Sequence, residues 1–318
     1  MGATDNQLMN FVDQKAKLAG SNRMELLLFS IGGRETFGIN VFKVREVCEP
    51  KPITPTPNMP STVEGIISLR GSIIPVLNLA KCLGMQAAEG PGKMIITEFS
   101  SSTQAFLVSE VDRIVRVDWE QVRSPQSTIV GGSGLVTALT ELPGGRLVSI
   151  LDVEQILADV MGEEEVPELD VQVPTNRPVF FVDDSALARK KITQVLEQMG
   201  LSFQQASNGR EAWERLQALA NQAQAEGEAL VKRLGLVLVD AEMPEMDGYV
   251  LTRHIRSDQR FAGIPVMMHS SLSSIANKKL GQQVGVDGYV AKFHFGELAS
   301  AIANMLKSGR SDNEGVKA

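Results

Sequence analysis

The pattern of hydrophobic and polar positions divides the chain into two halves of different character. In the first half, short runs rich in Val, Ile, Leu and Phe alternate with turn signals. Gly32-Gly33 separates two such runs within residues 25–44, and Arg70-Gly71-Ser72 separates two within residues 65–79. Because small residues between apolar runs are typical of hairpin turns, this half is expected to consist of β-hairpins.

A weak internal repeat runs through these strands. The hairpin pattern of residues 24–44 returns at residues 94–117, and the run 73–79 resembles the run 147–153. Repeated β units of this kind are typical of small barrels or sheets. We therefore expect an all-β region built as two small barrel-like subdomains.

In the second half, apolar runs that indicate strands alternate with helical patterns. Strands are predicted near residues 178–183, 202–206, 235–240, 264–269 and 286–291. Helices are predicted near residues 185–199, 209–232, 247–257, 272–284 and 295–307, with Gly227 as a break in the second. Five strand–helix units at this spacing predict a doubly wound α/β domain with a five-stranded parallel sheet and helices on both faces.

The composition shifts over residues 162–178, which are acidic, carry three prolines and lack helical periodicity. This predicts a linker at residues 162–177, between a first domain at 22–161 and a second at 178–309. Whether the linker is flexible or docks stays open. The segment 1–21 is expected to contain an amphipathic helix, and residues 310–318 are expected to be a disordered tail.

Charge and composition exclude several classes of function. The chain has 318 residues, a net charge of −7, 43% hydrophobic and 22% charged residues, as expected for a folded protein of about two domains. The negative charge argues against nucleic acid and anionic lipid as partners. No signal peptide is visible, and no apolar run approaches the roughly 18–20 residues that cross a bilayer, so a cytoplasmic protein without membrane insertion is expected.

Cysteine and histidine spacing gives no sign of a metal site. Cys48 and Cys82 do not form a CxxC pair, which argues against zinc and against a disulfide framework. His254, His269 and His294 show no helical i, i+4 spacing, and we expect them at the surface or in loops.

Polar residues end four of the five predicted strands of the second half. Asp183 and Asp184 follow the first strand, Asp240 ends the third, Ser270 the fourth and Lys292 the fifth. The functional crevice of a doubly wound sheet lies outside the carboxyl ends of its strands, so these side chains are expected to meet. Three clustered carboxylates are tolerable if they hold a divalent cation, and Mg²⁺ fits.

The same set suits phosphate chemistry. A carboxylate can act as a nucleophile and form an aspartyl phosphate. Lys292 can neutralise phosphoryl oxygens, and Ser270 can donate a hydrogen bond to one. The competing interpretations are that Asp184 or Ser185 only caps the next helix and that Lys292 is a solvated lysine.

Residues 178–307 resemble the response-regulator receiver domain, typified by the chemotaxis protein CheY. The matching pieces are 182-VDDS-185, 238-LVDAEMPEMDG-248, 270-SS-271 and 289-YVAK-292. The resemblance implies a flavodoxin-like fold in which Asp240 is the phosphoacceptor. Two departures stand out, because Phe293 follows the lysine where the family usually has proline, and the acidic Glu242 is expected to perturb access of the hydrolytic water.

The resemblance also assigns roles to the other residues of this edge. Asp183 and Asp184 would hold Mg²⁺ together with Asp240 and the backbone carbonyl of Glu242. Ser270 and Lys292 would contact the phosphoryl group, and Tyr289 would be the aromatic residue that changes rotamer on phosphorylation.

The first half, over about residues 22–160, resembles the CheW family of chemotaxis coupling proteins. The matching pieces are 36-TFGINVFKVREV-47 and 54-TPTPNMPSTVEGIISLRGSIIPVLNL-79, with Ser68 in place of the usual asparagine. The resemblance implies a surface that binds the cytoplasmic tips of chemoreceptors and the regulatory domain of the histidine kinase CheA. This surface would comprise Val44, Glu46, Gly65, Arg70 and Gly71. From the residues alone, Arg70 at a tight turn is either a ligand for a partner carboxylate or an ordinary solvated turn residue.

A CheW-like domain followed by a receiver is the layout of the CheV family. It implies a non-enzymatic scaffold, recruited to membrane-associated receptor arrays, that couples chemoreceptors to CheA, with CheW as a further partner. Mg²⁺-dependent phosphorylation of Asp240 would tune that coupling. The alternatives are a phosphate sink that drains CheA and a constitutive scaffold with an inactive receiver.

Two enzyme classes are disfavoured by the sequence. A phosphohydrolase of the haloacid-dehalogenase kind would need a D-x-D motif after the first strand, whereas Asp183 and Asp184 are adjacent, and no cap domain is present. A histidine kinase would need a glycine-rich nucleotide-binding set, which is missing.

Overall fold

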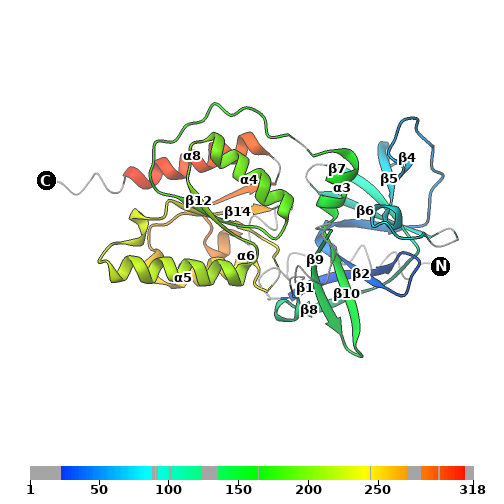
Figure 1. The fold of residues 1–318 in the computed structure, drawn as a ribbon, viewed down its shortest axis with the longest axis horizontal. Helices are drawn as coiled ribbons and strands as arrows, with labels where there is room; N and C mark the ends of the chain where they lie inside the picture. The colour runs from blue at the N-terminus through cyan, green and yellow to red at the C-terminus, as the bar shows by residue number, and fades with distance from the viewer. Residues whose placement is uncertain are drawn as a thin grey trace. The chain divides into compact units, whose positions relative to one another are not determined.

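The computed structural model describes residues 23–87, 90, 92–99, 102–123, 135–163, 165–243, 245–270, 281–292 and 294–311. The helix expected within residues 5–19, most of the helix expected at 272–284, Phe293 and residues 312–318 lie outside the described residues. The described chain forms two compact units, residues 23–163 and residues 165–311 (Figure 1).

The first unit contains two five-stranded sheets. One has the strand order β8 (Glu110–Asp118), β1 (Arg23–Ser30), β2 (Thr36–Asn40), β10 (Arg146–Leu151) and β9 (Val136–Leu142). The other has the order β3 (Val44–Cys48), β6 (Lys93–Phe99), β7 (Ser102–Val108), β5 (Ser72–Asn78) and β4 (Val63–Leu69). Both are antiparallel except at their centres, where β2 pairs with β10 and β5 with β7 in parallel. The expected division into two β subdomains is confirmed.

The two sheets follow the sequence repeat, but they exchange strands. Strands β1 to β5 form the first copy of the repeat and β6 to β10 the second, and corresponding strands occupy the same place in the two orders. The first sheet combines hairpin β1–β2 with β8, β9 and β10, and the second combines hairpin β6–β7 with β3, β4 and β5. Each sheet therefore contains strands from both copies.

Strand β1 is buried on both faces, which explains its unbroken apolar run. Leu26 and Leu28 pack in a core cluster with residues of β8, β9 and β10, inside the first sheet. Leu27 and Phe29 point the other way, into a cluster that also contains residues of β6 and β7 from the second sheet. Alternation cannot appear where both faces of a strand are covered. Short helical segments complete the unit: η2 (Val41–Lys43), α2 (Leu79–Cys82), η3 (Trp119–Gln121) and α3 (Val153–Met161).

The second unit is the predicted doubly wound domain. Its sheet has the order β12 (Phe203–Ala206), β11 (Val179–Val182), β13 (Leu236–Asp240), β14 (Val266–Ser270) and β15 (Gly288–Ala291), and all its pairings are parallel. Helices α4 (Ala186–Gln198) and α8 (Phe295–Ser311) cover one face, and α5 (Gly209–Ala225) and α6 (Gly248–Ser257) cover the other (Figure 1). The chain breaks after α5 at Gly227, whose φ is 72°, and continues through η4 (Leu230–Lys232).

The acidic segment before β11 packs on the second unit. Val173 is 6% exposed and lies in the core cluster formed with α4 and α8, and Val166, Leu169 and Val171 pack against that cluster. The backbone N–H of Leu169 donates to Gln198 Oε1 at 2.9 Å, at the end of α4. Residues 165–177 therefore form a strap docked on this unit, which answers the question that the sequence left open.

In the part of the chain that the structure describes, no helix combines the length and the apolar character required to cross a membrane.

Candidate functional site

The carboxyl ends of the parallel strands bring the predicted polar residues together. Asp183 and Asp184 follow β11, which lies beside β13 with Asp240 at its end. On the other side of β13, strand β14 ends at Ser270, and β15 is followed by Lys292, whose N–H donates to the Ser270 carbonyl at 3.0 Å. All five residues thus lie at one edge of the sheet, around its central strand.

The three aspartates form one cluster. Each of Asp183, Asp184 and Asp240 offers a carboxylate oxygen within 4.8 Å of the other two. Asp183 and Asp240 are buried, while Asp184 is half-buried. Ser185 is the N-cap of α4, because the N–H of Ala188 donates to its Oγ at 3.3 Å. The serine, not an aspartate, thus caps the helix, and Asp183 Oδ1 accepts the N–H of Ser185 at 3.0 Å.

Lys292 is inside the cluster rather than in solvent. Its Nζ lies 2.8 Å from Asp183 Oδ2 and 3.1 Å from Asp240 Oδ2, and its side chain is 3% exposed. The interpretation of Lys292 as a solvated lysine is therefore wrong. A buried ammonium group is tolerated at this position because carboxylate oxygens of two aspartates lie within ion-pair distance of it.

The cluster carries more negative than positive charge. Burial raises the pKa of Asp240 well above its usual value, Lys292 opposes that rise, and Asp183, Asp184 and Glu242 add to it. Asp183 Oδ2 lies 2.8 Å from Lys292 Nζ and has no further hydrogen-bond donor among the described residues. Buried carboxylate oxygens with excess negative charge are consistent with a Mg²⁺ site.

The loop after Asp240 is fixed by a close approach of two backbone segments. A Cβ on Gly248 would lie 2.0 Å from the carbonyl oxygen of Asp240, which only glycine can tolerate. Asp247 caps α6 by accepting the N–H of Val250 at 2.7 Å. The D-G pair of the motif therefore starts α6 directly against the end of β13.

Tyr289 is in contact with the phosphoryl-binding residue predicted beside it. Its hydroxyl shares a hydrogen bond with the Ser270 side chain, and burial raises the pKa of Tyr289 to about 12. Sequence reasoning missed a second tyrosine in this region, Tyr249, which is 3% exposed and packs against Ala241 and Met268. An aromatic residue at the start of a helix has the sequence pattern of an ordinary core residue, so no feature of the sequence distinguished it.

Sequence reasoning also missed Arg189. Its Nη1 donates to the backbone carbonyls of Asp183 and Asp184, at 2.8 and 2.9 Å. These bonds tie the backbone of the strand-to-helix loop, which carries the two aspartates, to α4. An arginine in the first turns of a helix after an acidic pair is the signal that would have found it.

The predicted coupling surface contains an ion pair. Arg70 and Gly71 form the two-residue turn between β4 and β5, with φ angles of 50° and 89°. Arg70 Nη2 lies 2.7 Å from Glu46 Oε2, and these side chains are 57% and 25% exposed. A left-handed backbone is costly for arginine, so this turn places a guanidinium where glycine or asparagine would be easier.

Two residues of the predicted coupling surface, Gly65 and Val44, are explained by backbone contact and by burial. Gly65 has φ 144°, and a Cβ there would lie 2.3 Å from the carbonyl oxygen of Thr54, in the loop that pairs with β4. Val44 is 6% exposed and lies in the cluster shared by the two sheets of the first unit. Glu46 and Arg70 are thus the members of the predicted coupling surface that offer side-chain area.

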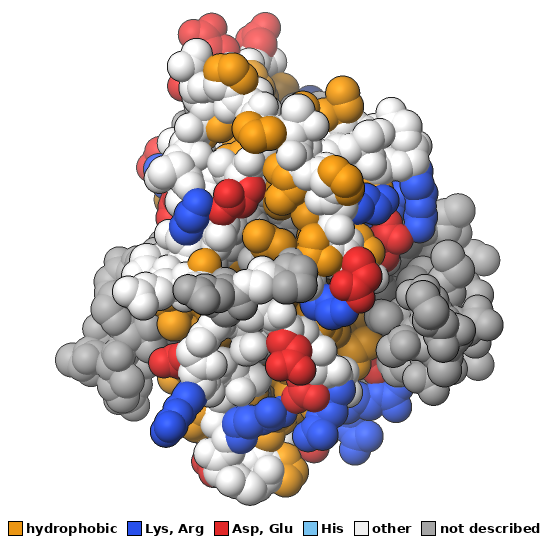
Figure 2. All heavy atoms as spheres, turned by 90° about the vertical axis from the view of Figure 1, so that its right-hand side faces the viewer, with side chains coloured by type: hydrophobic (Ala, Val, Ile, Leu, Met, Phe, Trp, Pro, Cys, Tyr) orange, Lys and Arg blue, Asp and Glu red, His pale blue; other side chains and the backbone are white. Residues whose placement is uncertain are grey.

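Hydrophobic side chains are exposed on the hairpins of the first unit. Ile73 on β5 is 71% exposed and Leu147 on β10 is 66% exposed, and the two occupy corresponding places in the repeat. Figure 2 shows hydrophobic side chains gathered on one face.

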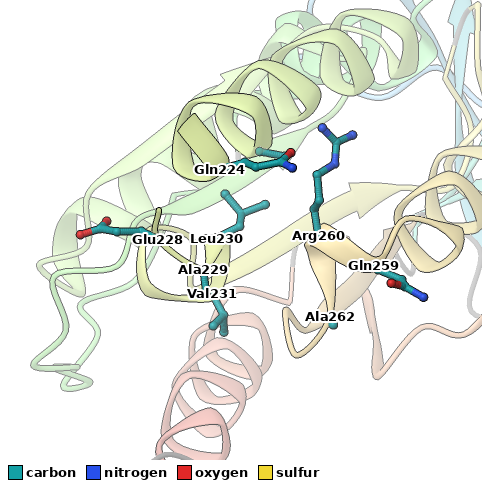
Figure 3. A pocket seen from close by; sticks show the side chains of 9 residues that line it. Gln224, Glu228, Ala229, Leu230, Val231, Gln259, Arg260 and Ala262 are labelled. Atoms are coloured by element: carbon teal, nitrogen blue, oxygen red, sulfur yellow. The ribbon is translucent and has the colours of Figure 1, made fainter. Parts of the chain in front are cut away.

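A pocket of about 320 Å³ lies on the second unit, away from the aspartate cluster (Figure 3). It is lined by the end of α5, the connection through η4, and η5 (Gln259–Phe261). Arg260, which borders it, is held by Asp258 at 3.0 Å. None of the predicted site residues lines this pocket.

One histidine contradicts the expectation of surface positions. His269 lies in β14, is 3% exposed and is the register partner of Asp240. It is buried because β14 lies inside the parallel sheet, with β13 on one side and β15 on the other. His254 is exposed on α6, and His294 precedes α8 with a side chain that is 42% exposed.

Comparison with known proteins agrees with both halves of this description. A family model of the CheW-like domain matches residues 25–161, and one of the response regulator receiver domain matches residues 179–303. The chain is 31% identical to chemotaxis protein CheV3 of Helicobacter pylori over 300 residues, 90% of this chain and 95% of that protein. It is 24% identical to CheV2 of the same organism, over 93% and 98% of the two chains.

A likeness to solved structures is found for each unit separately. The scaffolding protein TtCheW from Thermoanaerobacter tengcongensis matches with a TM-score of 0.41 and 26% identity, covering 44% of this chain and 91% of that one. The two matched domain families act in signalling and are not enzymes. Since the match to CheV3 extends over nearly the full length of both proteins, the chain belongs to the CheV family of chemotaxis proteins, with a CheW-like domain followed by a response regulator receiver domain.

Proposed function

We propose that this protein is a scaffold that couples chemoreceptors to the histidine kinase CheA and is regulated by phosphorylation of Asp240. The CheW-like domain, residues 22–161, makes the coupling contacts, and the receiver, residues 178–309, takes the phosphoryl group. The observation that carries the proposal is the buried cluster of Asp183, Asp184 and Asp240 around Lys292.

Each residue of the cluster has a separate role in the proposed phosphoryl transfer. A carboxylate oxygen of Asp240 attacks the phosphorus of a phosphohistidine; an O–P bond forms, the P–N bond breaks, and the histidine nitrogen takes a proton from solvent. Lys292 offsets the charge of the transferred group, and Ser270 donates a hydrogen bond to it. Asp183, Asp184, Asp240 and the carbonyl of Glu242 would hold Mg²⁺, which neutralises phosphoryl oxygens.

Lys292 also keeps Asp240 ready to act as a nucleophile. Burial and three neighbouring carboxylates favour the protonated carboxyl, which does not attack phosphorus. The ammonium group at 3.1 Å opposes this, and a divalent cation would oppose it further. Phosphorylation is therefore expected to depend strongly on Mg²⁺.

The regulatory part of the proposal rests on the two-domain layout. Phosphorylation can alter coupling only if the two states of the receiver differ in their contacts with partner domains. The partners proposed for the CheW-like domain are CheA, the cytoplasmic tips of chemoreceptors and CheW, at receptor arrays on the cytoplasmic side of the membrane. The partly exposed Glu46–Arg70 pair, with the guanidinium the more accessible of the two groups, supports this surface as a binding site for charged groups.

Phosphotransfer tests the proposal directly. Labelled phospho-CheA is mixed with the wild type and with Asp240→Ala, with and without Mg²⁺. We expect label to move to the wild type alone, and only with Mg²⁺. If label stays on CheA in every mixture, the receiver is inactive and the protein is a constitutive scaffold. Release of label as inorganic phosphate within seconds would instead indicate a phosphate sink.

A further inference from the structure

Tyr249 is a buried polar group whose hydroxyl has no use in the mechanism above. It is the second residue of α6, and its side chain is 3% exposed. Its hydroxyl has no hydrogen-bond partner among the residues that the structure describes. A buried hydroxyl without a partner loses its hydrogen bonds to water and gains none in the protein, which destabilises the folded state. Such groups are rare and call for an explanation.

The ring of Tyr249 is held rigidly beside the phosphoacceptor. The N–H of Gly248 donates to the carbonyl of Ala241 at 3.0 Å, and Thr252 Oγ1 donates to the carbonyl of Gly248 at 2.7 Å. Gly248 itself lies in close contact with the backbone of Asp240. The start of α6 therefore cannot shift to give the hydroxyl a partner without moving the end of β13.

Tyr289 lies in the same small cluster. The core of this cluster is Ala241, Tyr249 and Met268, and Tyr289 packs against it from β15. Burial raises the pKa of Tyr249, and the neighbouring Tyr289 and Glu242 raise it further. Tyr249 is thus neutral at physiological pH and carries both a proton to donate and lone pairs to accept a hydrogen bond.

Tyr289 and Ser270 share a hydrogen bond in this state. The serine hydroxyl has a single proton to donate. When Ser270 donates that proton to a phosphoryl group on Asp240, it turns toward the acceptor, and its bond to Tyr289 is weakened or lost. The Tyr289 hydroxyl can then bond a neighbour within its own cluster, where Tyr249 has a hydroxyl to offer.

We propose that Tyr249 supplies that partner, so that phosphorylation exchanges the bond between Tyr289 and Ser270 for a bond between Tyr289 and Tyr249. Tyr249 is then a positioning residue of the switch: it is unsatisfied in the unphosphorylated state and satisfied in the phosphorylated one. The inference rests on the proposed function, because it requires that Asp240 takes a phosphoryl group.

The exchange of hydrogen bonds predicts that Tyr249→Phe raises thermal stability and lowers the affinity for a phosphoryl mimic. Tyr249→Phe removes the unsatisfied hydroxyl from the resting protein, so the full-length variant should unfold at a higher temperature than the wild type. The same variant cannot supply the new bond, so its affinity for beryllofluoride with Mg²⁺, a mimic of the phosphoryl group, should fall about five- to tenfold. A merely structural role would move both measurements in the same direction.

A double-mutant cycle with Tyr289→Phe is the matched control, since it removes the partner hydroxyl. With beryllofluoride bound, the double variant should bind no more weakly than Tyr289→Phe alone, and in the resting state the two substitutions should be additive. Equal beryllofluoride affinity of Tyr249→Phe and wild type would overturn the inference while leaving the phosphoacceptor in place. Wild type that binds no beryllofluoride at all would overturn the proposed function and this inference with it.

Discussion

Arg70 forms an ion pair with Glu46 although their strands lie at opposite edges of one sheet. Strand β3, which carries Glu46, is the first in the order of that sheet, and the β4–β5 hairpin that carries Arg70 at its turn is the last. The pair therefore connects the two edges of the sheet through their side chains. It also holds the guanidinium at the surface in a fixed position.

Replacing Arg70 should separate binding from stability. The pair is only partly exposed, with the two side chains 57% and 25% accessible, so Arg70→Ala should lower the free energy of unfolding by about 1 kcal/mol. Capture of CheA and of receptor cytoplasmic fragments should fall at least tenfold. Thermal unfolding and a pull-down assay with purified partners measure the two effects.

The repeat offers a matched control for that experiment. Arg146 begins β10, the counterpart of β5, and pairs with Asp112 at 3.0 Å with both side chains 42% exposed. Arg146→Ala should leave capture of both partners unchanged. Equal losses for the two variants would contradict a specific role of Arg70.

Asp240→Asn should stabilise the metal-free protein in a pH-dependent way. The folded pKa of Asp240 is raised above its ordinary value of 3.8, so the folded state binds this proton more tightly than the unfolded state. Wild-type stability should therefore fall as pH rises above about 3.9 and level off once the pH exceeds the folded pKa. The advantage of the asparagine variant should be absent at about pH 3.5 and full at the upper plateau.

Mg²⁺ should reduce the difference in stability between the wild type and Asp240→Asn. A cation beside Asp240 compensates the charge that the asparagine removes. Unfolding curves of both proteins at several pH values, with and without Mg²⁺, measure it. A difference that does not depend on pH would refute the assignment to the ionisation of Asp240.

The strap should contribute to the stability of the receiver. Val173→Ala removes two methyl groups from a buried position and should lower the free energy of unfolding of this domain by about 1–2 kcal/mol. Glu168→Ala, at an exposed position of the same segment, is the control and should have no effect. If denaturant unfolding gives the same midpoint for all three proteins, the strap is not bound in solution.

Gly248→Ala should disturb the phosphorylation site from its backbone side. The new Cβ would lie 2.0 Å from the Asp240 carbonyl oxygen, and relieving that overlap should cost about 1–3 kcal/mol of stability. Phosphotransfer to Asp240 should slow as the strand end is displaced. Gly296→Ala, in α8 with open space around the new methyl group, should instead stabilise by about 0.5–1 kcal/mol and leave phosphotransfer unchanged.

The sequence predicted the site well because the carboxyl ends of the strands of a parallel sheet all lie at one edge. Once the strands were located, their carboxyl ends had to meet, and Asp183, Asp240 and Lys292 had to lie near one another. What the pattern did not reveal depends on tertiary contacts. Arg189 looks like a solvated helical arginine until the loop carbonyls fold back on it, and Tyr249 looks like ordinary core until its hydroxyl lacks a partner.

The strap was hidden by its composition. Glutamates and prolines around Val166 favoured a linker, although Leu169, Val171 and Val173 alternate with polar residues in the way of an extended segment with one buried face. The strand exchange in the first unit was hidden for another reason. Alternating apolar residues predict strands, but they do not say which distant strand each one pairs with.

That strand exchange means that neither copy of the repeat is a folding unit by itself. A fragment ending between β5 and β6 would hold one hairpin of the first sheet and three strands of the second, with neither sheet complete. Two fragments cut there should be unstructured when separate and should form the native unit when mixed. Folding must also bring β2 beside β10, which is far away in the chain, so the unit should fold slowly and as a whole.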